Sequence, residues 1–142
     1  MSLEIAKPDN WQDFERISAR LCEKIYKTRN IHRYGRQGQR QNGVDIMIES
    51  EEGIEGIQCK HVEKLTFSEI DEEIEKAEKF IPALKSFKFY TTLKRDTTIQ
   101  SYIAGKSQEY RTKNLFDIDI LSWEDIAEKL QETKNYDILE DF

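Results

Sequence analysis

The sequence is short of the residues that build disulfide frameworks, metal clusters and membrane spans. Its 142 residues include two cysteines, two histidines and two prolines. No run approaches the ~18 apolar residues that a membrane span requires. Residues 1–8 have no apolar core of the kind that signal peptides contain. These absences predict a protein that works away from membranes, in the cytoplasm.

Both cysteines, Cys22 and Cys59, lie in apolar patterns, which predicts reduced and buried thiols rather than a disulfide. A zinc site is not expected, because neither the cysteines nor the histidines stand at ligand spacing. A phosphate-binding loop is not expected either. Residues 104–107 resemble the end of such a loop, but Gln100 stands where its upstream glycine is required.

Length and composition predict a single globular domain. Charged residues make up 35% of the chain and hydrophobic residues 37%, and 142 residues are enough to bury a core. We place this domain at residues 1–133. Residues 134–142 are interpreted as a C-terminal tail or as the start of a connection to a further domain.

The net charge of −6 is unevenly distributed along the chain. Between residues 24 and 42 there are six basic side chains and no acidic one: Lys24, Lys27, Arg29, Arg33, Arg36 and Arg40. The local field near a site matters more to a polyanion than the total charge does. This segment is therefore either a solvated basic loop or a surface for nucleic acid.

Residues 43–60 carry the most informative pattern. Two apolar or alternating stretches flank the turn residues 50–53, which predicts a β-hairpin with a four-residue loop. In that register Glu49 pairs with Ile54, and Asp45 stands opposite Gln58.

The same register sorts the hairpin side chains into two faces. Directly opposed residues have Cβ atoms ~4.5–5.5 Å apart. Lys60 projects from the face of Gln58, because it lies two residues further along the strand. On the other face Val44 meets Cys59, next to a pair of isoleucines. We therefore expect Asp45, Gln58 and Lys60 to converge on one surface.

The remaining elements follow from caps and periodicity. A helix is predicted from about Trp11 to Tyr26, capped by Asp9. Thr66 begins a second helix that Pro82 closes. A strand at residues 86–92, a helix capped by Asp96, a strand at 116–120 and a helix capped by Ser122 complete the domain. The order α-β-β-α-β-α-β-α predicts an α/β fold whose central mixed sheet is flanked by helices.

The hairpin residues have the chemistry of a magnesium site. Mg²⁺ takes oxygen ligands and keeps several waters, so one or two protein carboxylates suffice. Asp45, the Gln58 side-chain carbonyl and the Cys59 backbone carbonyl can supply oxygens, and Glu15 can reach the metal from the first helix. Lys60 could orient or deprotonate a water and offset phosphoryl charge.

Each of these residues also has an ordinary structural interpretation. Asp45 can be a solvent-facing residue near a turn. Gln58 and Lys60 are residue types common on an exposed strand face, and Glu15 can lie on the wet margin of an amphipathic helix.

In these motifs the chain resembles the PD-(D/E)xK nuclease superfamily, and within it the Mrr-like restriction endonuclease branch. The resemblance covers nearly the whole chain. It is carried by the residues Trp11-Gln12-Asp13-Phe14-Glu15, by residues 34–46 with their pattern Gly-x-x-Gly-Gln-x-Gln-x-Gly-x-Asp, by Gln58-Cys59-Lys60, and by Thr91-Thr92 followed by Arg95-Asp96.

The resemblance implies a restriction-endonuclease-like fold and a Mg²⁺-dependent endodeoxyribonuclease, with Mn²⁺ as a substitute. It implies that Glu15, Asp45, Gln58 and Lys60 occupy the active-site positions, with Asp45 as main metal ligand and Lys60 as catalytic lysine. The superfamily's usual acid is Gln58 here, as in the Mrr-like branch. Similar domains stand in bacterial anti-phage effectors, which suggests a role in restriction or antiviral defence and a sensor domain, fused or separate, as a partner.

Double-stranded DNA is the expected substrate, held mainly through its phosphates and cut with little intrinsic sequence specificity. Seven residues are candidate DNA contacts: Arg33, Arg36, Gln39, Arg40, Gln41, Lys94 and Arg95. Cutting both strands needs two sites, which suggests a homodimer or larger assembly. The alternatives are a nuclease that resolves Holliday junctions, an RNA nuclease, and a catalytically inert nucleic-acid-binding or assembly module with the same fold.

Overall fold

The computed structural model describes residues 5–28, 30–34, 42–132 and 135–141. At its centre lies a five-stranded mixed sheet in the order β1-β2-β3-β4-β5. Strands β1 to β3 are antiparallel neighbours, whereas β3, β4 and β5 run parallel. The strands are β1 (Ile31–Arg33), β2 (Ile46–Ser50), β3 (Gly53–Lys60), β4 (Ser86–Thr91) and β5 (Asp117–Leu121).

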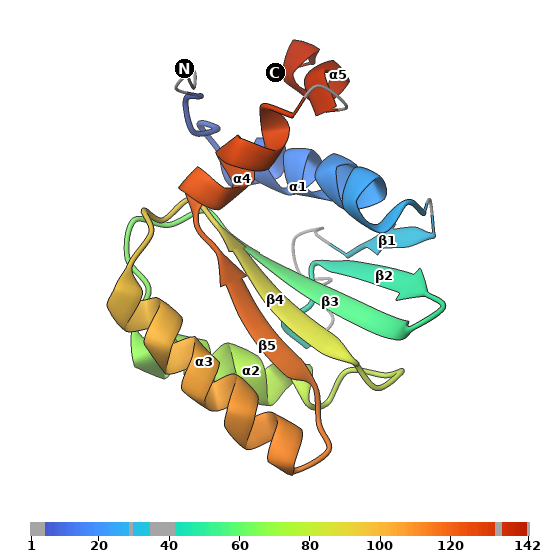
Figure 1. The fold of residues 1–142 in the computed structure, drawn as a ribbon, viewed down its shortest axis with the longest axis vertical. Coiled ribbons are helices and arrows are strands. Elements are labelled where there is room, and N and C mark those ends of the chain that lie inside the picture. Colours follow the sequence, from blue (N-terminus) through green and yellow to red (C-terminus); the bar gives the residue numbers. More distant parts are fainter. Residues whose placement is uncertain (1–4, 29, 35–41, 133–134, 142) are drawn as a thin grey trace.

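Helices cover both faces of the sheet (Figure 1). One face carries α1 (Trp11–Tyr26), α4 (Trp123–Leu130) and α5 (Tyr136–Glu140), and the other carries α2 (Phe67–Ala77) and α3 (Thr97–Thr112). Each layer has its own apolar core. The core under α1 and α4 includes Ile46, Ile57 and Tyr90 of the sheet, and that under α2 and α3 includes Met47, Phe87 and Phe89.

The predicted α/β class with a mixed sheet flanked by helices is confirmed, but the predicted element order lacks two elements. The segment expected to be a loop contains β1, which pairs with β2 through Arg33 and Ile46. β1 has three residues, of which one is apolar, so its sequence shows no alternation of apolar and polar side chains. Only its pairing with β2 identifies it as a strand. The second addition is α5, within the segment interpreted as a tail.

The short helix α5 packs against α1 and α4. Ile138 is buried in the core that these helices share. Arg20 of α1 forms ion pairs with Asp137 and Asp141, and Lys24 lies 3.3 Å from Asp137. Whether the chain leads on to a further domain stays a prediction.

Three of the four predicted helix caps are confirmed. Thr66 and Ser122 each form a reciprocal capping box, and the Asp96 carboxylate accepts hydrogen bonds from two amides of α3. The cap of α1 was predicted one residue too early. Asn10, not Asp9, accepts the bond from the Asp13 amide at 2.8 Å.

Pro82 does not close α2. This helix ends at Ala77, and two further turns of the backbone bring Phe80 back into the core. Ile81 follows Ile74 at helical spacing, but it is exposed. Apolar residues thus continue at helical spacing beyond the end of α2. The spacing by itself does not show where the helix ends.

The hairpin register is confirmed at its loop end. Glu49 pairs with Ile54, and Ser50 also pairs with Gly53, so the loop has two residues rather than four. Among the described residues, no helix is both long and apolar enough to cross a membrane.

The cap position yields a stability prediction. Asn10→Ala should lower the free energy of unfolding by about 1 kcal/mol, since it removes the acceptor for the Asp13 amide. Asp9→Ala, one residue earlier, should change it by less than about 0.5 kcal/mol, as surface substitutions usually do. Urea unfolding followed by circular dichroism measures both. Equal losses in the two variants would contradict the assignment of the cap to Asn10.

Candidate functional site

The strand that carries Asp45 contains a β-bulge just before β2. Regular pairing with β3 stops at Ile46 and Ile57, and the Asp45 amide also donates to the Ile57 carbonyl, at 2.8 Å. Two residues thus stand opposite one, which disrupts the alternation of side chains. The predicted pairing of Asp45 with Gln58 is therefore wrong. So is the pairing of Val44 with Cys59, because Val44 packs into the core under α2 and α3, whereas Cys59 faces α1.

The bulge brings the Asp45 carboxylate to the backbone of β3. Its Oδ2 accepts a hydrogen bond from the Cys59 amide at 2.7 Å, in the place where a strand carbonyl would otherwise accept. Asp45 is 3% exposed. Because the N–H and C=O of one strand residue point to the same side, the Cys59 carbonyl faces the side on which Asp45 lies.

Gln58 and Lys60 flank that amide and project toward α2 and α3. They are paired in the parallel ladder with Phe89 and Thr91, so their side chains share a face with the Phe89 ring. Gln58 is fully buried. The Lys60 side chain is 16% exposed, and its Nζ lies 3.5 Å from Oε1 of Glu73.

Glu73 of α2 is the member of this group that the sequence interpretation missed. It is buried, and its carboxylate lies next to the turn before Asp45. A Cβ placed on Gly43 would be 3.2 Å from Glu73 Oε2 and 3.3 Å from Gln58 Oε1. One signal could have found it. Glu73 stands on the buried stripe of α2 with Ile70, Ile74 and Ala77, where an apolar residue is expected.

Glu15 approaches from the opposite face. It is 3% exposed on α1, and its Oε1 accepts from the Arg33 guanidinium at 3.1 Å and 3.4 Å. Arg33, predicted as a DNA contact, is thus ion-paired with a predicted site residue. Glu15 and Cys22, seven residues apart on α1, are both buried, so Glu15 does not lie on the solvent-facing side of the helix.

The Cys59 thiol has a raised pKa. Burial raises this pKa well above the usual range, and the negative charges of Asp45 and Glu15 act in the same direction. Burial also raises the pKa of Cys22 to about 12. Both are free cysteines, and at neutral pH both are protonated and therefore poor nucleophiles.

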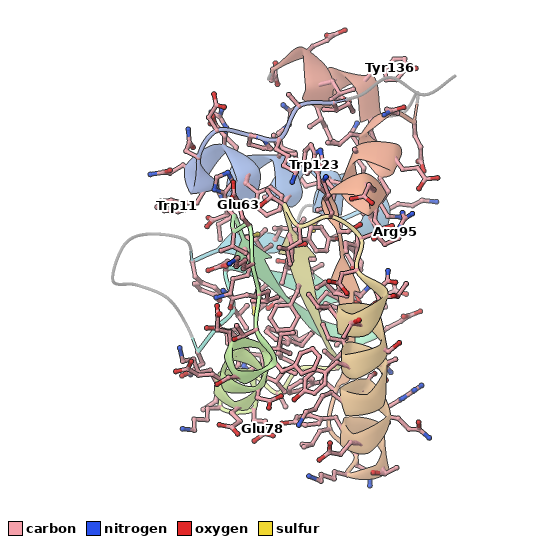
Figure 2. The ribbon with its side chains drawn as sticks, turned by 90° about the vertical axis from the view of Figure 1, so that its left-hand side faces the viewer. Trp11, Glu63, Glu78, Arg95, Trp123 and Tyr136 are labelled. Atoms are coloured by element: carbon pink, nitrogen blue, oxygen red, sulfur yellow. The ribbon has the colours of Figure 1, made fainter. Side chains whose placement is uncertain are left out.

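The other predicted DNA contacts do not join this group. Arg36, Gln39, Arg40 and Gln41 lie outside the described residues. Arg95 is bound to α4, where its guanidinium donates to Asp125 and its amide to Glu124. Figure 2 shows the side chains of Arg95 and Glu63 well apart. Lys94, the residue before Arg95, is exposed.

The donor atoms of the group are oxygens. Within the described ranges, no cluster of three or more His, Cys, Asp or Glu side chains could hold a metal ion. One carboxylate, an amide oxygen and a backbone carbonyl do fit Mg²⁺, which keeps waters and uses few protein ligands. The magnesium site stays a prediction.

Comparison with known proteins adds no assignment: no protein-family model and no curated protein matches this sequence.

Gly43 gives a stability prediction for the site. It has a φ of +76°, and its missing Cβ leaves room for the Glu73 and Gln58 oxygens. Gly43→Ala should lower the free energy of unfolding by about 1–2 kcal/mol, the cost of a left-handed conformation for a residue with a Cβ. Gly105 is the matched control, because a Cβ there meets nothing within 4 Å. Gly105→Ala, inside α3, should instead stabilise by about 0.5–1 kcal/mol. Chemical denaturation measures both, and a stabilised Gly43→Ala would contradict this account of the turn.

Proposed function

We propose that this protein is a Mg²⁺-dependent endodeoxyribonuclease domain that hydrolyses phosphodiester bonds in double-stranded DNA. The observation that carries the proposal is the hydrogen bond from the Cys59 amide to the Asp45 carboxylate. This bond holds the Asp45 carboxylate against the backbone of Cys59, the residue between Gln58 and Lys60. A restriction-endonuclease-like topology, as expected from the sequence motifs, is part of the proposal.

Asp45 would hold the metal, together with the Gln58 side-chain oxygen and the Cys59 carbonyl. When bound, Mg²⁺ supplies polarisation of the phosphate and activation of a water. Lys60 contacts Glu73 as an ion pair, so its role in the proposal is that of a cation. It holds a phosphate oxygen and offsets the negative charge that develops during attack.

Glu15 is the second candidate carboxylate for the metal. It is held by Arg33, whose side chain is 44% exposed. An arginine at that exposure can turn to a DNA phosphate, which would leave the Glu15 carboxylate to a cation. DNA contact through phosphates favours low sequence specificity, in keeping with a role in restriction or anti-phage defence.

A specific observation favours the inert module as second candidate. Glu15 and Glu73 both have basic partners within the fold, and Gln58 brings no charge. A protein that neutralises its buried acids internally need not bind a metal. Salt-sensitive DNA binding without cleavage is what this candidate predicts.

Nicking of supercoiled plasmid tests the proposal. Lys60→Ala should nick at least about 100-fold more slowly than the wild type in Mg²⁺, as expected for loss of a residue at the reacting phosphate. Lys64→Ala, at an exposed lysine four residues later, should nick at the wild-type rate. EDTA should abolish the reaction. Equal rates for the wild type and Lys60→Ala across Mg²⁺ and Mn²⁺ would rule out catalysis by this site. Four-way junctions and RNA, run in parallel with duplex, separate the junction-resolving and RNA alternatives.

Metal binding is tested separately with Asp45→Asn. Asparagine keeps an oxygen that can accept from the Cys59 amide, so the variant should fold, but it loses the charge that a cation requires. Calorimetric titration with Mn²⁺ should show binding to the wild type and at least about tenfold weaker binding to the variant. Equal binding to both would place the metal elsewhere.

A further inference from the structure

The ion pair between Lys60 and Glu73 is unusual in where it lies. α2 packs on the sheet with an apolar stripe, and Glu73 occupies one position of that stripe. Its side chain is 7% exposed and that of Lys60 is 16% exposed. A buried pair of charges commonly stabilises a fold less than apolar residues of the same size would. Stability by itself therefore gives little reason for a glutamate at this position.

Glu73 lies against two parts of the candidate site at once, Lys60 and the turn at Gly43. Oε1 lies 3.5 Å from the Lys60 ammonium. Oε2 lies beside the turn at Gly43, two residues before Asp45, where a Cβ on Gly43 would be 3.2 Å from it. One carboxylate from α2 thus spans the space between the lysine and the turn that leads to the aspartate. A change at Glu73 would be felt on both sides of the proposed metal site.

A second lysine also reaches Glu73, but in a different environment. Lys76 Nζ lies 3.5 Å from the same Oε1, one turn away on α2, and its side chain is 47% exposed. Pairs at this spacing and exposure contribute little, because water screens them. The Lys60 pair is screened less, since both of its side chains are largely buried.

We infer that Glu73 is a positioning residue for Lys60: its carboxylate holds the ammonium at the site formed by Asp45 and Gln58. This inference rests on the proposed function. A lysine has four rotatable bonds and loses much conformational freedom when it is held in one place. A fixed partner on a helix supplies that restraint before DNA arrives. Pre-organised charge of this kind favours the chemical step rather than DNA binding.

The first test measures the restraint without using nuclease activity. A lysine side chain held against a carboxylate in a largely buried position is poorly accessible to acetic anhydride and reacts slowly with it. Mass spectrometry reports the labelling of each lysine. Glu73→Gln should raise the labelling rate of Lys60 at least about threefold. Glu72→Gln is the matched control, with the same change of charge at an exposed position of α2, and should leave Lys60 labelling unchanged. Lys60 labelling that is equal in both variants would overturn the inference.

The second test asks whether the restraint matters to the reaction. Glu73→Gln should lower kcat for plasmid nicking at least about tenfold with an unchanged KM for DNA. Glu73→Asp keeps the negative charge, so Lys60 retains an acidic partner. Its kcat should lie between those of Glu73→Gln and the wild type. Lys76→Gln should nick at the wild-type rate. In a Lys60→Ala background, Glu73→Gln should cause no further loss, because its effect passes through Lys60.

The outcomes separate this inference from the proposed function. If the wild type nicks faster than Lys60→Ala while Glu73→Gln and Glu73→Asp both nick at the wild-type rate, the positioning role is wrong and the nuclease proposal stands. A Glu73→Gln loss that appears only in KM, or that is equally large in the Lys60→Ala background, would also overturn the positioning role. If wild type and Lys60→Ala nick equally, the nuclease proposal fails on its own control.

Discussion

The hydrogen bond between the Asp45 carboxylate and the Cys59 amide is the constraint on which the arrangement of this site depends. It lies just beyond the last regular pair of β2 and β3. There the Asp45 side chain accepts the hydrogen bond that a backbone carbonyl of the neighbouring strand would otherwise accept. Burying a carboxylate costs several kcal/mol unless it is hydrogen-bonded. A charge-assisted bond from a backbone amide offsets part of that cost. The amide itself is rigid, because β3 is paired with β4 on its other edge.

Around that bond, two buried glutamates each pair with a basic residue of a different element. Glu15 of α1 meets Arg33 of β1, and Glu73 of α2 meets Lys60 of β3. Each pair joins a helix to a strand, one on either face of the sheet. Acidic side chains are rarely buried unless they are paired, as these two are. The rest of the hairpin, with Ile46, Ile48 and Ile57, is ordinary apolar packing.

The net charge of the whole chain does not describe the charge around the candidate site. The chain is acidic overall, yet the described residues of the site bring lysine and arginine into contact with glutamate. The net charge thus says little about this surface. Arg95, by contrast, donates hydrogen bonds to Asp125 and Glu124 of α4. A basic residue at a strand end is not by itself a nucleic-acid contact.

The sequence by itself determined the class of the fold, the main helices and strands, three of four caps, and the pairing of Glu49 with Ile54. These features are local: a cap bonds to an amide two or three residues away, and alternation reports the face of a residue on its own strand. Only the tertiary structure decided the bulge at Asp45, the pairing of β1, and the contacts of Glu73 and Arg33. Each depends on where one element crosses another, and no periodicity within a single element records that crossing. A bulge shifts the alternation by one residue, so it reverses every face assignment beyond it, as it did for Val44.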